Sequence, residues 1–155
     1  MGNSRTITSG HDCRMSMAKG VDLLADTVEI TLGPLGRNVA IEDEFGGQKV
    51  TKDGVTVAKS LNFKNKLHQL AASMVKEAAA KTNDGAGDGT TTATLLTRAI
   101  FSEGNKLVAA GHNSMEVKRG IDKAAALICE ELQNLSTACS DSEAIQKVAT
   151  ISSNG

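Results

Sequence analysis

One short segment combines features that suit it to binding a phosphate group. Residues 87–92 read Gly-Asp-Gly-Thr-Thr-Thr, and the apolar pattern after them predicts a helix that begins near Thr90. Glycine lets backbone N–H groups approach a phosphate closely, and the first turn of a helix offers unpaired N–H groups at the positive end of its dipole. Asp88 supplies a carboxylate of the kind that holds Mg²⁺ beside phosphates. Three β-branched threonines weaken a helix start, so we favour a phosphate site over a plain capped helix.

Two further segments could join such a site if the fold brings them near. Residues 31–37, Thr-Leu-Gly-Pro-Leu-Gly-Arg, could bend around a ligand with Arg37 close by, although glycine-proline sequences usually mark ordinary loops. Residues 52–54, Lys-Asp-Gly, form a tight turn by default and a cation-plus-carboxylate site only if they lie near the phosphates. The residues alone leave both alternatives open.

Other chemical signatures are weak or missing from the sequence. No Gly-Lys dipeptide occurs, which excludes a Walker A loop, and the glycines of residues 85–89 do not fit the dinucleotide-binding fingerprint. The three histidines lack metal-ligand spacing. The three cysteines (Cys13, Cys129 and Cys139) are odd in number and form no Cys-x-x-Cys pair, which favours reduced thiols over disulfides or a zinc site.

The elements that must position these segments are mostly helices. Apolar residues at helical spacing predict helices at 12–31, 65–81, 90–110, 113–135 and 141–151. Val39 and Ile41 alternate with polar neighbours, and with a turn at 45–47 and a return strand at 49–51 they predict a small β-hairpin. We expect residues 83–85 to end the second helix.

Sequence patterns also predict which helix residues are buried and which cap a helix. In the first helix Val21, Leu24, Ala25 and Val28 form an apolar stripe. In the second, the shared face is predicted to hold Leu67, Leu70, Ala71, Met74, Val75, Ala78 and Ala79. Asn113 and Ser140 each precede a glutamate by three residues and are predicted N-caps.

Composition excludes several functional classes. The chain has 155 residues, of which 40% are hydrophobic and 23% charged, as is typical of one globular domain. Its net charge of −1 argues against general nucleic-acid binding, and no apolar run reaches the length of a membrane span. We therefore expect no nucleic-acid partner and no membrane partner. The first residues lack the apolar core of a secretory signal, so we do not expect secretion.

The motifs taken together resemble those of the group I (GroEL-type) chaperonin large subunit. They occur in collinear order from about Arg5 to the last residue, and the Gly-Asp-Gly-Thr-Thr-Thr-Ala-Thr run is the most specific of them. The segments that carry the resemblance are 31–34, 50–58, 86–94, 119–124 and 148–152.

This resemblance implies a mainly α fold, an incomplete chaperonin equatorial-domain-like helical domain with a small β-hairpin. Residues 1–11 would form a leader strand, and residues 12–155 the N-terminal half of the equatorial, ATP-binding domain. The intermediate and apical domains of a complete family member would be absent. Ser114 stands where the family usually has proline, which should only soften a helix start.

The resemblance also implies functions for individual residues. Those that would bind the nucleotide are Thr31, Leu32, Gly33, Pro34, Lys52, Asp88, Gly89, Thr90, Thr91 and Thr92. Asp88 would ligate Mg²⁺, and Asp53 would position the attacking water or a cation as a catalytic residue whose partner carboxylate is missing. Leu35 replaces the basic residue usual in this loop, which removes one positive charge near the phosphates.

The function that follows from the resemblance is ATP-dependent assistance of protein folding and refolding by an ATP-hydrolysing chaperonin. The subunit would form stacked homo-oligomeric rings, with the co-chaperonin lid and unfolded proteins bound through the absent domains. The alternative is a truncated, non-catalytic interaction fragment that co-assembles with full-length subunits. Without the second carboxylate we expect the isolated chain to be inactive in hydrolysis. The expected location is the matrix of mitochondria or another organelle, or the bacterial cytoplasm.

Overall fold

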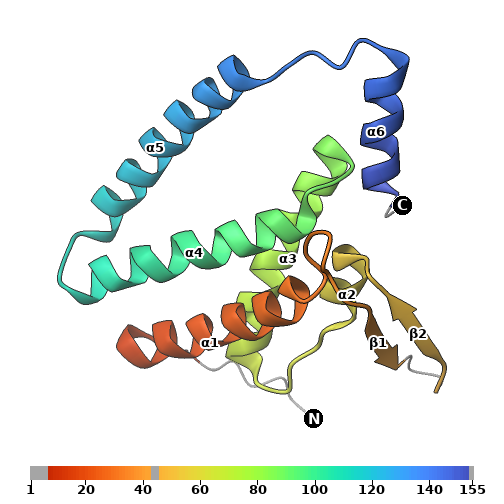
Figure 1. Cartoon of the computed structure of the whole chain (residues 1–155). Coiled ribbons are helices and arrows are strands. Elements are labelled where there is room, and N and C mark those ends of the chain that lie inside the picture. The colour runs from red at the N-terminus through yellow and green to blue at the C-terminus, as the bar shows by residue number, and fades with distance from the viewer. Residues whose placement is uncertain (1–6, 43–45, 154–155) are drawn as a thin grey trace. The chain divides into compact units, whose positions relative to one another are not determined.

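The fold is mainly α, as the sequence predicts, with one small antiparallel hairpin. The computed structural model describes residues 7–42 and 46–153. Its elements, traced in Figure 1, are α1 (Gly10–Glu29), β1 (Val39–Glu42), β2 (Gln48–Thr51), α2 (Gly54–Ser60), α3 (Lys66–Ala86), α4 (Thr90–Ala109), α5 (Ser114–Leu135) and α6 (Ser142–Ser152). The chain divides into two compact units, Met1–Ala109 and Ala110–Gly155, which are described separately.

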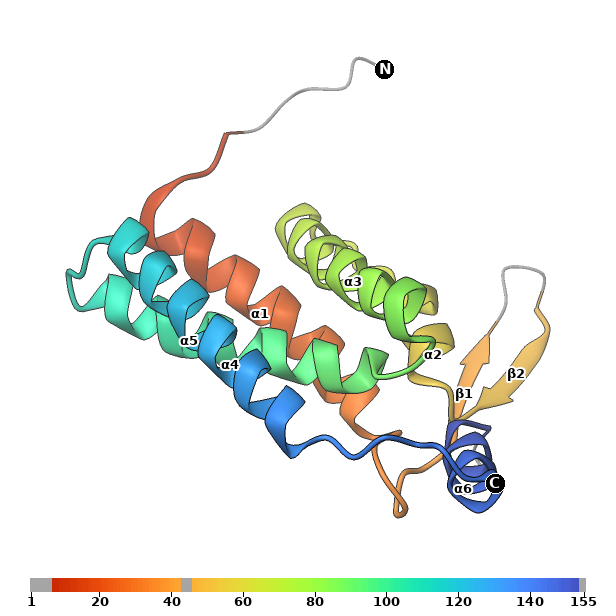
Figure 2. The same cartoon turned by 90° about the horizontal axis from the view of Figure 1, so that it is seen from above.

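The core of the first unit lies between α1, α2 and α3, and α4 packs against α1 and α3 (Figure 2). The predicted stripe of α1 is confirmed, because Val21, Leu24, Ala25 and Val28 are all buried. The helices approach closely at Gly20, where an added Cβ would lie 2.6 Å from both Cα and the carbonyl oxygen of His68 on α3. The absence of a side chain at this crossing therefore lets α1 and α3 pack backbone to backbone.

The buried face of α3 differs from the predicted one. Its buried residues are Ala71, Ala72, Val75 and Ala79, whereas Leu70 and Met74 are more than half exposed, at 53% and 59%. The close approach at Gly20 explains the difference, because a helix so near accepts alanine in preference to leucine or methionine.

The end of α3 also differs from the prediction, since the helix continues through residues 83–85 to Ala86. Gly87 then adopts a left-handed conformation, with φ of 72°, and its N–H donates to the carbonyl of Asn83 at 2.7 Å. This glycine cap, rather than the Asn-Asp-Gly sequence before it, ends the helix.

The hairpin and the first helix largely follow the predictions. β1 pairs with β2 in the register Val39↔Thr51 and Ile41↔Lys49, and part of the predicted turn lies outside the described residues. The leader strand predicted for residues 1–11 is wrong at its end, because Gly10 and His11 already belong to α1. Ser9 is extended and Gly10 has a φ of 75°, so the chain turns into the helix there. Residues 1–6 of the predicted leader lie outside the described part.

The second unit consists of α5 and α6. Asn113 caps α5 as predicted, accepting hydrogen bonds from the N–H groups of Met115 and Glu116, so the helix starts normally at Ser114. The cap of α6 is Asp141 and not Ser140, because the Asp141 carboxylate accepts from the N–H of Ala144 at 2.6 Å. Neither helix has a buried residue, although both are amphipathic in sequence.

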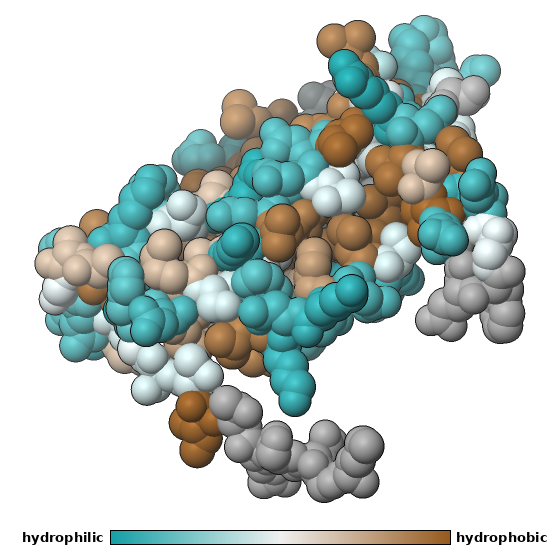
Figure 3. Space-filling view, turned by 90° about the horizontal axis from the view of Figure 1, so that it is seen from below, coloured by the Kyte–Doolittle hydropathy of each residue, from teal (hydrophilic) through white to brown (hydrophobic). Residues whose placement is uncertain are grey.

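Apolar side chains also lie on the surface. Figure 3 shows brown apolar residues between teal polar ones on one face of the molecule. Among the described helices, none combines the length and the apolar character needed to cross a lipid bilayer.

Candidate phosphate-binding site

Three segments that the sequence analysis singled out meet at Gly54, the first residue of α2. A Cβ added to Gly54 would lie 2.1 Å from Oγ1 of Thr91 and 3.4 Å from Oγ1 of Thr31. Gly54 is buried, so the start of α2 is held directly against the first turn of α4 and the end of α1. The turn of residues 52–54 therefore lies beside a residue of each of the other two segments.

The loop after α1 folds back on itself beside Lys52. The N–H of Arg37 donates to the carbonyl of Ile30 at 2.8 Å, and the N–H of Gly36 donates to that of Gly33 at 3.0 Å. A Cβ at Gly36 would lie 2.3 Å from the Thr31 carbonyl oxygen and 2.9 Å from Cε of Lys52. The half-buried Lys52 side chain therefore runs along this loop and brings a positive charge to it.

Within the loop, burial separates one anchor from an accessible tip. Thr31 is buried, and its hydroxyl donates to the carbonyl of Val28 at 2.7 Å. Leu32, Gly33 and Pro34 are exposed, and Gly33 has a φ of 72°, which a residue with a side chain rarely adopts. The loop thus has a fixed base at Thr31 and an exposed tip at residues 32–34, in which the N–H of Leu32 donates to the carbonyl of Glu29 at 3.0 Å.

The N-terminus of α4 has no side-chain cap of its own at the preceding position, because that residue is Gly89, with a φ of 88°. By contrast α2, α3, α5 and α6 each begin with an Asp or Asn that accepts from the first N–H groups. Thr90 is buried and its carbonyl accepts from the hydroxyl of buried Thr94 at 2.9 Å, whereas Thr92 is exposed. The first turn is therefore partly buried, and like other helix N-termini it favours an anion at its N–H groups.

Asp53 has a structural role that the sequence analysis missed. It caps α2: one carboxylate oxygen accepts from the N–H of Val55 at 3.2 Å, and the other accepts from the N–H and hydroxyl of Thr56 at 3.0 and 2.5 Å. Burial acts to raise the pKa of Asp53, but the hydrogen bonds from Thr56 and Val55, with the charge of Lys49, outweigh it and lower the pKa. The group is held as a carboxylate, and the cap leaves acceptor capacity for a water or cation.

Asp88 lies between the end of α3 and the start of α4, on the exposed side of the site, and its Oδ1 accepts from the N–H of Gly89 at 2.6 Å. In the described part of the chain, no three His, Cys, Asp or Glu side chains gather closely enough to hold a metal by themselves. An Asp beside a helix N-terminus fits Mg²⁺, which uses one or two carboxylates and takes its remaining ligands from phosphates and water.

A model of the TCP-1/cpn60 chaperonin family matches residues 24–155, more than half of the chain. The chain belongs to this chaperonin family. The match spans all three segments that meet at Gly54 and both compact units, and it confirms the resemblance to chaperonins.

A solved chaperonin has a similar fold. It is chaperonin gp146 from the bacteriophage EL 2 (Pseudomonas aeruginosa), crystallised in the presence of ATP-BeFx, with 38% sequence identity and a TM-score of 0.59. The similarity covers 64% of this chain and 19% of the phage chaperonin. This chaperonin chain thus corresponds to about one fifth of the length of that relative.

Replacing Gly54 with alanine should disrupt the meeting point. The new Cβ would overlap Oγ1 of Thr91, so the Thr91 side chain must rotate or one of the two helices must shift, and we expect the free energy of unfolding to fall by about 1–3 kcal/mol. Gly85→Ala is the matched control: an added Cβ there meets nothing within 4 Å, and the position is helical. That variant should gain about 0.5–1 kcal/mol. Equal stability of the two variants in urea denaturation would contradict the close approach.

The lowered pKa of Asp53 predicts a specific dependence of stability on pH. Because the folded-state pKa lies below that of the unfolded chain, the cap stabilises fully above about pH 4 and less as the pH falls through the folded value. We expect Asp53→Asn, which has one acceptor oxygen in place of the two that Asp53 uses, to lower the free energy of unfolding at pH 7 by about 1 kcal/mol and to flatten its decline below pH 4. Thr56→Val, which removes one hydrogen bond, should give an intermediate profile. Parallel acid profiles for Asp53→Asn and the unaltered chain would refute this.

Proposed function

We propose that this chain is the nucleotide-binding and ring-contact part of a chaperonin subunit that uses ATP to assist protein folding and refolding. The observation that supports it is that Gly54 lies against Thr91 and Thr31, while Lys52 lies against Gly36 of the loop that follows α1, so that parts of the three segments are neighbours. Family membership supports the same reading. The phage chaperonin was crystallised with ATP-BeFx, which makes a nucleotide the natural ligand to test.

The proposed roles follow from where each residue lies. Residues 31–34 would lie around the phosphates, with the exposed tip of the loop nearest to them, and Gly89, Thr90, Thr91 and Thr92 would present the N–H groups of the first turn of α4 to phosphate oxygens. Lys52, held along the loop, would offset phosphate charge. Asp88 would hold Mg²⁺, which when bound neutralises negative charge on the phosphates.

Asp53 would orient the attacking water or hold a cation while capping α2. Both duties need an ionised carboxylate, and the lowered pKa of Asp53 keeps it ionised at neutral pH. Positioning and charge neutralisation dominate phosphoryl transfer, so one carboxylate without its partner supports binding better than hydrolysis. We infer that the chain alone binds ATP but hydrolyses it poorly.

We also propose the cellular setting and partners that such a subunit requires. A complete subunit would form stacked rings, and would bind a co-chaperonin lid and unfolded proteins through domains beyond this part of the family fold. The three cysteines are free in the structure, which suits a reducing location such as an organelle matrix or the bacterial cytoplasm.

Nucleotide binding can be tested with one pair of variants. Mg²⁺-dependent binding of ATP, followed by calorimetry, should weaken at least tenfold in Asp88→Ala, because a cation ligand beside the phosphates is lost. Asp84→Ala is the control, since this carboxylate is exposed in the last turn of α3, outside the three segments. Binding that survives in Asp88→Ala, or that is equally weakened in Asp84→Ala, would remove support for the site.

A second candidate function is co-assembly with complete subunits as a non-catalytic interaction module. The second unit favours it: α5 and α6 bury no residue, and their apolar side chains are more than half exposed at Met115, Leu127, Ile128, Leu132, Leu135, Ile145, Val148 and Ile151. Exposed apolar surface of this kind promotes association.

This second function predicts that the chain enters rings of a complete chaperonin. Native mass spectrometry of a mixture should show rings in which one or more subunits have been replaced by the 155-residue chain. The double variant Ile128→Lys with Leu132→Lys should abolish incorporation. Lys123→Glu, which reverses a charge on the opposite, polar face of α5, should leave incorporation unchanged. Rings that never incorporate the unaltered chain would exclude this function.

A further inference from the structure

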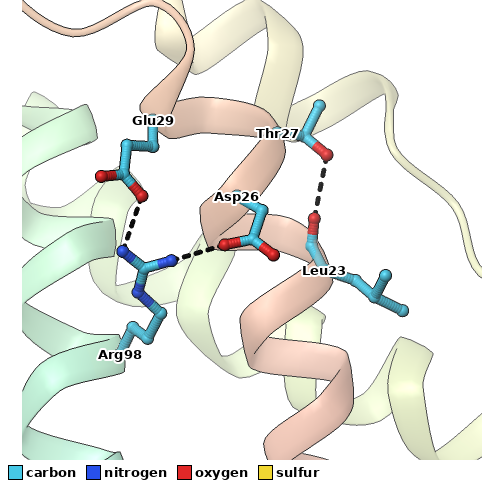
Figure 4. A network of polar contacts seen from close by, with 5 residues as sticks. All are labelled: Leu23, Asp26, Thr27, Glu29 and Arg98. Carbon is cyan, nitrogen blue, oxygen red and sulfur yellow. Dashed lines mark hydrogen bonds and ion pairs between the residues drawn. The ribbon is translucent and has the colours of Figure 1, made fainter.

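Arg98 joins two helices that carry different parts of the candidate site. From α4 it donates through Nη1 to Oδ1 of Asp26 and through Nη2 to Oε2 of Glu29 on α1, both at 2.7 Å (Figure 4). One planar guanidinium thus spans two carboxylates a turn apart. The hydrogen bond that Arg98 donates to Glu29 raises the pKa of Arg98 despite its partial desolvation, so the group is charged at any working pH.

This contact differs from the other ion pairs in the described ranges. Those of Lys81, Lys106, Lys118 and Lys147 each link residues three or four positions apart on one helix and are largely exposed on both sides. Pairs of that kind contribute little. The Arg98 side chain is 25% exposed, against 69% for Asp26 and 50% for Glu29, and it links these residues about 70 positions away through two separate charge-assisted hydrogen bonds.

The place of the contact along both helices relates it to the site. Glu29 is the last residue of α1, and its carbonyl accepts from the N–H of Leu32, so its position sets where the phosphate loop begins. On α4, Arg98 lies two turns after Thr91 and so shares its helix face. One face of α4 therefore holds the end of α1 at Arg98 and contacts Gly54 at Thr91.

The charges at the end of α1 need such a partner. Asp26 and Glu29 place two negative charges at the negative end of the helix dipole, and the last turn of α1 has no basic residue. Without Arg98 these carboxylates would repel each other and the last carbonyls, and the end of α1 would loosen where the loop begins.

We infer that Arg98 is a positioning residue for the phosphate site, which fixes the loop of residues 31–36 against the first turn of α4 by holding Asp26 and Glu29. The identity of the ligand in this inference rests on the proposed nucleotide-binding function. The effect of Arg98 on the position of the loop does not depend on any ligand. It extends the site to a side chain that touches neither phosphate nor metal.

The first test measures binding of ATP with Mg²⁺ in Arg98→Met, which keeps a long side chain but removes the charge. We expect affinity to weaken on the order of tenfold, because small misplacements of a positioning loop are costly. Arg98→Lys, which cannot span both carboxylates, should lie between. The double variant Glu29→Gln with Arg98→Met should bind ATP as strongly as Arg98→Met alone, because the two substitutions remove the same interaction. Lys106→Met, on the same helix, is the control and should bind normally.

The second test needs no ligand. Amide hydrogen exchange at Gly36 and Arg37, whose N–H groups close the loop, should accelerate at least fivefold in Arg98→Met while exchange at Val75 in the core of α3 is unchanged. If the unaltered chain binds no ATP, the proposed function fails and this measurement still decides the role of Arg98. Unchanged exchange at Gly36 and Arg37, or loss of protection spread equally over α3, would overturn the inference.

Discussion

The geometry of the site depends on the absence of a side chain at Gly54. Gly54 allows the start of α2 to lie against Thr91 and Thr31, and any Cβ there would overlap the Thr91 hydroxyl. Thr31, Gly54 and Thr91, which belong to three different parts of the chain, can therefore lie against one another. The contact also explains why the Lys-Asp-Gly sequence matters: glycine makes the approach possible, Asp53 caps the helix that begins there, and Lys52 follows the neighbouring loop.

A second close approach supports the first. Gly20 and the alanine face of α3 let α1 and α3 pack backbone to backbone, so the end of α1 is fixed by a core of small aliphatic side chains. Such packing leaves little freedom, because interiors at this density resist even small displacements. The loop of residues 31–36 begins two residues after α1 ends, so its position depends on the position of that helix. Arg98 adds an electrostatic restraint at the same end of α1.

The sequence predicted those features that local patterns determine. Apolar spacing placed the stripe of α1 on the right residues, and the Asn113 cap was evident from its neighbours. Features that depend on tertiary distance were not predictable: the alanine face of α3 was misjudged because Leu70 and Met74 are the more hydrophobic side chains. The cap at Asp53 could have been predicted, because an aspartate directly before a helical segment is typical of an N-cap. It was not predicted because residues 52–54 also have the sequence of a tight turn. Arg98 had none, because its partners are distant in sequence.

The replacement of a basic residue by Leu35 can be weighed by its position. Leu35 is 93% exposed at the tip of the loop, so a lysine there would project its charge into water, where salt screens it within about 10 Å. Lys52 is half-buried and lies along the same loop, where its charge is screened less. A positive charge near the loop therefore persists in this chain despite the substitution. The loss at position 35 should affect the rate at which an anionic ligand is attracted more than the strength with which it is held, since exposed charges act mainly through long-range steering.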